Sequence, residues 1–119
     1  MESRISITKS YSLGFPTKFY RDNSIRIYKY LVLYYDDVEK AIGIHFSNDE
    51  TEENKYAVIH SKNGYGGSAV VRSFFNTYNI DPKKYHGKYK WEKQQLEGAG
   101  GLFIIDLKEK ETTNGVKAS

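Results

Sequence analysis

The segment KYLVLYYDDVEKAIGIHF, residues 29–46, decides the fold of this 119-residue chain. Residues 29–35 are nearly all apolar and β-prone, which predicts a strand that is buried on both faces. The polar residues 36–40 are typical of a turn, and residues 41–46 return as a second β-prone run. The segment is therefore predicted to be a β-hairpin.

Further strands are predicted on both sides of this hairpin. Apolar and polar residues alternate over 4–8, and the runs at 56–61 and 102–107 have the length and composition of strands. A short helix is predicted over 16–23, because Pro16 stands where the first turn of a helix accepts a proline.

A second helix is predicted directly after the glycines at 64–67. Apolar side chains recur there at helical spacing and form a stripe for the core: Val70, Val71, Phe74, Phe75 and Tyr78. Asp81 and Pro82 end this helix, because the residue before a proline is pushed out of the α-helical conformation.

Residues 85–92 alternate between aromatic and charged side chains. Tyr85, Tyr89 and Trp91 fall on one side, and Lys88, Lys90 and Glu92 fall on the other. Exposed rings beside lysines would form a stacking platform for single-stranded nucleic acid. A sheet with one face in the core gives the same pattern without any binding role, and we favour this interpretation. Lysines on the outer face would still suit phosphates.

The order strand, short helix, strand, turn, strand occurs twice. A shift of 55 residues aligns 19–34 with 74–89 and gives five identities in sixteen positions without a gap. The identical pairs are Phe19 and Phe74, Ile25 and Ile80, Lys29 and Lys84, Tyr30 and Tyr85, and Tyr34 and Tyr89. We predict an α+β fold of two pseudo-repeated strand–short helix–β-hairpin units, forming a mostly antiparallel sheet or barrel with the helices packed on it. The units span about 4–46 and 66–107 and are joined by 47–65.

The first of these units resembles the swapped-hairpin domain of AbrB-type transcription factors. The resemblance rests on a strand, the Gly-Phe-Pro sequence at 14–16 that opens a helix, an isoleucine and the hairpin. Two such units in one chain resemble the MraZ arrangement. The match is looser over 66–107, where Val71 stands in place of the proline. In the first unit, "RIYKY" at 26–30 replaces the Gly-Asp turn of the family.

The resemblance implies DNA binding by basic residues around the first strand, the proline and the helix. Carried over position by position, it points to Lys9, Lys18 and Arg21 in the first half, and to Arg72, Lys83 and Lys84 in the second. It also implies a homodimer, because swapped hairpins are shared between chains, whereas a tandem pair could instead close within one chain.

The composition is that of a globular protein, with 39% hydrophobic and 28% charged residues. A single domain is predicted over 1–107, followed by a polar, unpatterned and flexible tail at 108–119. The chain has no apolar run of membrane-spanning length, and its first residues lack the apolar core of a signal peptide. The absence of cysteine excludes disulfides and thiolate metal sites. These features predict a cytoplasmic protein without a cofactor or a membrane partner.

The net charge of +3 is unevenly distributed along the chain. Residues 1–35 carry a net +4 and residues 55–95 a net +6, whereas residues 36–54 carry a net −6. Two basic segments around an acidic one favour a molecule with one face for polyanions and an acidic far side. An ordinary solvated surface would give the same totals.

The glycine-rich stretch at 64–68, GYGGS, is a candidate phosphate-contacting loop. Successive backbone N–H groups before a helix can converge on an anion, which makes Gly64, Gly66, Gly67 and Ser68 candidates. The stretch lacks the Lys-Ser/Thr pair of a P-loop and the third glycine of a dinucleotide-binding fingerprint. The favoured interpretation is a mobile joint between the two halves, with Ser68 as the N-cap of the second helix.

No catalytic or metal-binding arrangement is recognisable in the sequence. His45, His60 and His86 stand alone on separate segments, and no histidine has a partner at ligand spacing. The acidic run at 49–53 lacks the glycine and the ordered alternation of a calcium loop. We therefore predict neither an enzyme nor a metal site.

The sequence thus favours a small DNA-binding protein and transcriptional regulator that grips phosphates through two basic segments. The candidate contact residues are Lys9, Lys18, Arg21, Arg26, Arg72, Lys83, Lys84 and Lys88. The alternative is a non-enzymatic protein-interaction or adaptor domain that uses an exposed aromatic patch or a sheet edge.

Overall fold

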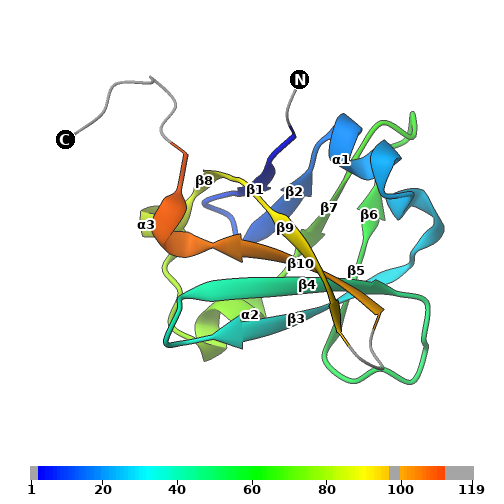
Figure 1. The fold of residues 1–119 in the computed structure, drawn as a ribbon. Coiled ribbons are helices and arrows are strands. Elements are labelled where there is room, and N and C mark those ends of the chain that lie inside the picture. The colour runs from blue at the N-terminus through cyan, green and yellow to red at the C-terminus, as the bar shows by residue number, and fades with distance from the viewer. Residues whose placement is uncertain (1–2, 97–99, 112–119) are drawn as a thin grey trace.

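The computed structural model describes residues 3–96 and 100–111. One sheet contains β1 (Ile5–Ile7), β2 (Ser12–Phe15), β6 (Ile59–His60), β7 (Gly67–Val70) and β8 (Gly87–Tyr89). The other contains β3 (Tyr30–Asp36), β4 (Ala41–Ser47), β5 (Lys55–Ala57), β9 (Glu92–Leu96) and β10 (Gly100–Asp106). The strand order is β6-β7-β2-β1-β8 in the first sheet and β5-β3-β4-β10-β9 in the second (Figure 1).

The hairpin predicted over 29–46 is confirmed as β3 and β4. The two strands pair from Tyr30 opposite Ser47 to Asp36 opposite Ala41. On its other edge β4 pairs with β10, and Ile42 lies opposite Ile105. The hairpin and the closing strand therefore form the centre of the second sheet.

The two sheets are connected at both edges by strands that pass from one sheet to the other. Only Val58 separates β5 from β6, and only Lys90 and Trp91 separate β8 from β9. Every strand pairing among the described residues is antiparallel and stays within one sheet. The antiparallel α+β prediction is confirmed, but the strands form two sheets and neither the single sheet nor the closed barrel that the sequence predicted.

The core lies between the sheets and is dominated by aromatic rings. Phe19 is fully buried, and its ring centroid lies 4.9 Å from that of Phe103 and 5.1 Å from that of Trp91. Phe15 and Phe46 complete the cluster, with centroids 5.2 Å apart. Edge-to-face ring pairs of this kind stabilise a core beyond the area that they bury.

The helices in the described part of the chain are short. α1 (Thr17–Asp22) buries Phe19 and Tyr20 on its inner side, and α2 (Arg72–Thr77) buries Phe74 and Phe75. α3 (Pro82–Tyr85) follows, and single 3-10 turns occur at η1 (Ile25–Ile27) and η2 (Leu107–Glu109). None of the helices in these ranges has the length and apolar content that a membrane crossing requires.

The sequence analysis missed the two short strands β2 and β7, which pair with each other. Leu13 lies opposite Ala69 in this pairing. The helix expected from Val70 begins at Arg72 instead, with Val71 at the cap position, so the assignment of Ser68 as N-cap is wrong. The mobile joint is also wrong at Gly67 and Ser68, because both residues belong to β7. Four-residue segments that contain glycine and serine have weak β-propensity, and their pairing depends on partners distant in sequence.

Two other boundaries differ from the prediction. The strand expected at 56–61 is interrupted at Val58, where the chain passes between the sheets. Residues 108–111, assigned from the sequence to the tail, include the end of η2 and a backbone bridge between Glu111 and Lys88.

The aromatic side chains of 85–92 face the core, as the favoured interpretation predicted. Tyr89 is fully buried, and Tyr85 and Trp91 pack against the core cluster. Lys88, Lys90 and Glu92 are exposed. The alternation therefore reflects one buried face of the chain and gives no stacking platform at these rings.

Tyr89 provides a prediction for the pH dependence of stability. Its hydroxyl donates a 2.6 Å hydrogen bond to the Tyr85 carbonyl oxygen, and burial, with a smaller contribution from Tyr85, raises the pKa of Tyr89 to about 12. In the unfolded chain the pKa of tyrosine is about 10. The folded state therefore favours the protonated hydroxyl, and this contribution to stability is complete below pH ~10 and is lost as the pH rises towards ~12.

We expect the free energy of unfolding to fall by on the order of 2 kcal/mol across this range because of Tyr89 alone. Denaturant titrations at several pH values would measure the change. Tyr89→Phe is the control, since it cannot ionise and should lose less stability over the same range. If the free energy of unfolding changed equally with pH in the two proteins, the result would contradict the raised pKa of Tyr89.

Candidate nucleic-acid interface

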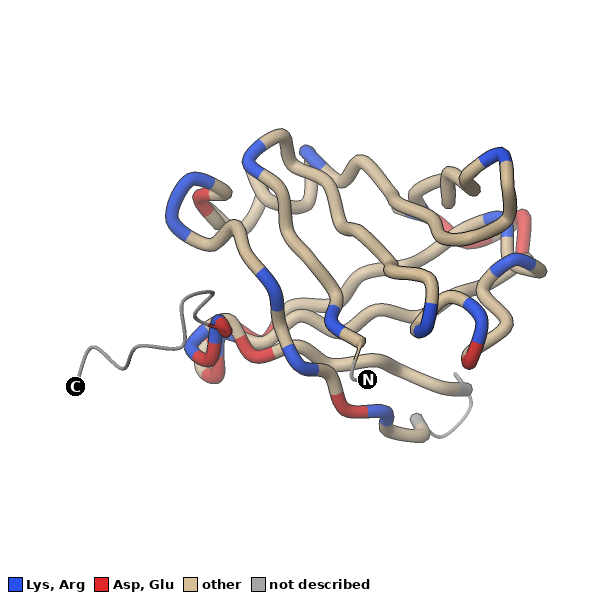
Figure 2. Tube along the Cα trace, turned by 90° about the horizontal axis from the view of Figure 1, so that it is seen from above, with Lys and Arg blue, Asp and Glu red and all other residues tan. Residues whose placement is uncertain are grey.

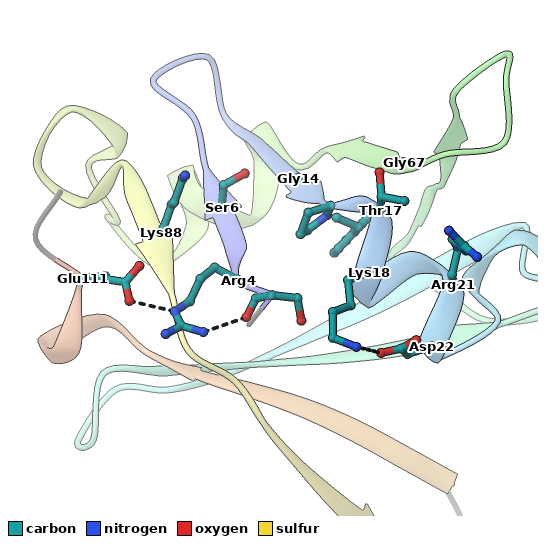
Figure 3. Close-up of a pocket in the computed structure, with 13 residues that line it drawn as sticks. Arg4, Ser6, Gly14, Thr17, Lys18, Arg21, Asp22, Gly67, Lys88 and Glu111 are labelled. Carbon is teal, nitrogen blue, oxygen red and sulfur yellow. Dashed lines mark hydrogen bonds and ion pairs between the residues drawn. The ribbon is translucent and has the colours of Figure 1, made fainter. Parts of the chain in front are cut away.

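An open groove of about 1180 Å³ lies on the outer side of the first sheet. Figure 3 shows its two sides, with Arg4 and Lys88 on one side and Lys18 and Arg21 of α1 on the other. Ser6 and Gly14 lie between these two groups. The groove therefore combines four basic side chains with a floor that contains the small residues Ser6 and Gly14.

Strand alternation explains the floor. Ser6 lies opposite Gly14 on one side and opposite Lys88 on the other. Because neighbouring residues of a strand point to opposite faces, Ile5, Ile7 and Leu13 enter the core while Ser6 and Gly14 face outward. A Cβ atom at Gly14 would collide with the Ser6 hydroxyl oxygen, so the glycine leaves the space that this hydroxyl occupies.

The basic residues of α1 project along one side of the groove. Phe19 and Tyr20 anchor the inner face of the helix, which leaves Lys18 and Arg21 exposed on the outer face. Lys18 Nζ lies 2.7 Å from the Asp22 carboxylate, and both side chains remain more than half exposed. An exposed pair at i and i+4 contributes only about 0.5 kcal/mol, so Lys18 can exchange this partner for a phosphate at little cost.

Arg4 was not among the residues selected from the sequence. Its Nε atom donates to Oε2 of Glu111 at 2.8 Å, and Nη1 donates to the Ser3 carbonyl oxygen at 3.0 Å. The alternation over 4–8 contained the relevant signal, because it places Arg4 and Ser6 on the same outer face.

The groove brings together only part of the set of basic residues predicted from the sequence. Lys18, Arg21 and Lys88 line it, as does Gly67 of the glycine stretch. The other members lie outside its lining: Lys9, Arg26, Arg72, Lys83 and Lys84.

Two of these outlying residues contact aromatic rings. The Arg72 guanidinium lies 4.3 Å from the centre of the Tyr11 ring, and Lys84 Nζ lies 5.2 Å from that of Tyr85. Lys9, in the turn between β1 and β2, is exposed, as are Arg26 on η1 and Lys83 on α3. The sequence alone could not separate the basic residues on the groove from the rest.

The glycine stretch forms a tight turn between β6 and β7. Gly64 N–H donates to the Ser61 carbonyl oxygen at 3.0 Å, and Tyr65 N–H donates to Ser61 Oγ at 3.0 Å and Asn63 Oδ1 at 3.1 Å. Gly64 needs its freedom here, because its φ of +75° lies in the left-handed region. These two amide groups are engaged within the turn and are not directed together at an outside anion.

Histidines and acidic residues form no ligand cluster in the ranges that the structure describes. His60 connects three segments instead, because its Nδ1 lies 2.7 Å from the Tyr20 hydroxyl and its Nε2 lies 2.9 Å from the Tyr28 carbonyl oxygen. His45 Nδ1 lies 2.8 Å from the Gly101 carbonyl oxygen. Both rings take part in the hydrogen bonding of the fold.

Basic and acidic positions are intermixed along part of the trace of the described residues (Figure 2). Figure 2 shows acidic positions gathered mainly towards two ends of the trace, with basic positions distributed over the strands and loops between and among them. One acidic group, Glu50, accepts hydrogen bonds from the Tyr30 hydroxyl at 2.8 Å and from Lys29 Nζ at 3.5 Å. The hydrogen bond from Tyr30 is the main reason that the pKa of Glu50 is lowered, although burial opposes it.

Comparisons with known proteins identify no relative: the chain matches no protein-family model, no curated protein and no solved structure.

Proposed function

We propose that this protein binds DNA through the groove on the outer side of its first sheet. The observation that carries the proposal is the convergence of Arg4, Lys18 and Arg21 with Lys88, which is distant from them in sequence, around one open cavity. Lysine and arginine side chains that approach from two sides suit a phosphate backbone, which supplies most of the affinity in non-specific DNA binding.

The size and lining of the groove support the same proposal. Its volume of about 1180 Å³ is above the range of about 300–1,000 Å³ that is typical of small-molecule pockets. The four basic side chains face two acidic ones, Asp22 and Glu111, so the lining carries a net charge of +2. Serine hydroxyls are common phosphate donors, and Ser6 provides one here.

We include in this proposal that the chain contains an internal repeat and that its units resemble AbrB-type domains. A shift of 55 residues takes the bounds of β2 onto those of β7, and those of α1 onto those of α2. It also pairs the buried residues Phe19 and Phe74. The pairing of β4 with β10 joins strands of the two halves within one chain, which favours a tandem pair closed on itself over a homodimer. Transcriptional regulation is the role that such a DNA-binding protein would serve.

Fluorescence anisotropy of labelled DNA, titrated with the protein at several salt concentrations, tests the proposal. If three groove cations contact phosphates, the slope of log affinity against log salt should be about −2.7, since each contact contributes about −0.9. Raising the salt from about 50 to about 200 mM should then weaken binding about 40-fold. Absence of binding, or a slope shallower than about −1, would overturn the proposed function.

A protein-interaction role is the second candidate, and one observation favours it. Ile59 and Val70 are each 51% exposed and lie on neighbouring strands of the first sheet, where Ile59 is opposite Ser68. An apolar partner at this position would bind with little dependence on salt, because apolar contacts release few counterions. DNA-independent capture of a protein partner that persists at high salt would favour this candidate.

A further inference from the structure

The Arg4 end of the groove already holds an anionic group, which is the carboxylate of Glu111. Arg4 Nε and Glu111 Oε2 are 2.8 Å apart, and their side chains are 16% and 36% exposed. This distance is that of a charge-assisted hydrogen bond. Figure 3 shows the carboxylate directed at the guanidinium, beside Lys88.

Backbone contacts fix Glu111 at this position. Its N–H donates to the Lys88 carbonyl oxygen at 2.9 Å, so the chain after η2 runs along the free edge of β8. Lys110 Nζ donates to the Lys84 carbonyl oxygen at 3.1 Å, and the Lys110 stem lies close over Gly87, where a Cβ atom would leave it no room. The carboxylate is therefore held by the segment 107–111 and not only by its own flexible side chain.

We infer that the Arg4 end of the groove is a phosphate-binding position that Glu111 occupies as an internal competitor. The inference rests on the proposed function. Carboxylate and phosphate oxygens accept the same charge-assisted hydrogen bonds from a guanidinium. A backbone phosphate that takes this position has to displace the Glu111 side chain or approach against its negative charge.

Removing the charge of Glu111 should therefore strengthen the binding of DNA. Glu111→Gln preserves the size of the side chain and the backbone bridge to Lys88, and it raises the net charge of the groove lining from +2 to +3. We expect affinity to rise about two- to fivefold, and fivefold corresponds to about 1 kcal/mol, the upper end of the range for ion pairs near a protein surface. One additional phosphate contact should also make the salt slope steeper by about 0.9.

Glu109→Gln is the matched control. Glu109 is the last residue of η2, two positions before Glu111, and it is exposed and does not line the groove. The substitution adds the same charge to the whole protein, so it reports the general electrostatic effect. The experiment measures the anisotropy of a labelled DNA duplex with wild-type protein, Glu111→Gln and Glu109→Gln over the same salt series.

The outcomes separate this inference from the proposed function. Tighter binding and a steeper slope for Glu111→Gln, with Glu109→Gln close to wild type, are the expected result. All three proteins could bind DNA in a salt-dependent way, with equal affinities for the two variants. That result would overturn the inference that Glu111 is an internal competitor, but it would not contradict the proposed function. Weaker binding by Glu111→Gln would also overturn it, because Glu111 would then support the site. Absence of binding by all three would overturn both.

Discussion

Replacing Phe19 by alanine is expected to lower the free energy of unfolding by about 3–5 kcal/mol. The ring is fully buried and contacts four other rings: Phe15, Phe46, Trp91 and Phe103. The substitution removes the apolar burial and leaves a cavity that both sheets and α1 would have to fill. Because rings from both sheets meet at this position, the surrounding core can collapse only in part.

Denaturant unfolding followed by fluorescence or circular dichroism would measure this loss. Tyr34→Ala is a suitable control, since Tyr34 is 44% exposed on β3 and its truncation should cost far less. A loss below about 1 kcal/mol for Phe19→Ala would contradict the packing of the Phe19 ring in the core between the sheets. The substitution should also weaken DNA binding indirectly, because Phe19 anchors the helix that presents Lys18 and Arg21.

The sequence predicted those elements whose signal is local. The hairpin 29–46 combines a long β-prone run, a polar turn and a returning strand, and the structure places it in the middle of a sheet. The proline at position 16 and the buried pair Phe19 and Tyr20 likewise make α1 predictable. In each case neighbouring residues alone provide the pattern.

The elements that the sequence missed depend on partners far along the chain. β2 and β7 are short, contain glycine and gain their hydrogen bonds from each other across more than fifty positions. The passage of the chain from β5 to β6 at Val58 follows from the packing of two sheets and has no local signature. For this reason the spacing of the apolar residues predicted a helix from Val70, two residues before α2 begins at Arg72.

The candidate site shows the same division between local and distant information. Net charge identified two basic segments, and three of the candidate residues chosen from them meet at the groove, namely Lys18, Arg21 and Lys88. Lys9, Lys83 and Lys84 have the same formal charge but lie outside the lining of the groove. The order of the strands determines which basic residues reach the groove. Arg4 joins the groove because β1 lies between β2 and β8, and this neighbourhood cannot be derived from the residues around Arg4.

Combined replacement of Lys18, Arg21 and Lys88 by glutamine is expected to weaken DNA binding by at least about 100-fold at about 50 mM salt. Each phosphate contact that is lost removes the release of about one counterion, so the slope of log affinity against log salt should fall towards zero. The three side chains are exposed, and surface substitutions of this kind usually change stability by less than about 0.5 kcal/mol each. The variant should therefore remain folded.

The most direct test of the groove compares this variant with a matched triple replacement of Lys9, Lys83 and Lys84 by glutamine. Both proteins lose three positive charges, but only the first loses them from the groove lining. Anisotropy titrations of the same labelled DNA should show the 100-fold loss for the groove variant and no more than about a tenfold loss for the control. Equal losses for the two variants, or a greater loss for the control, would contradict the assignment of the groove as the DNA-binding surface.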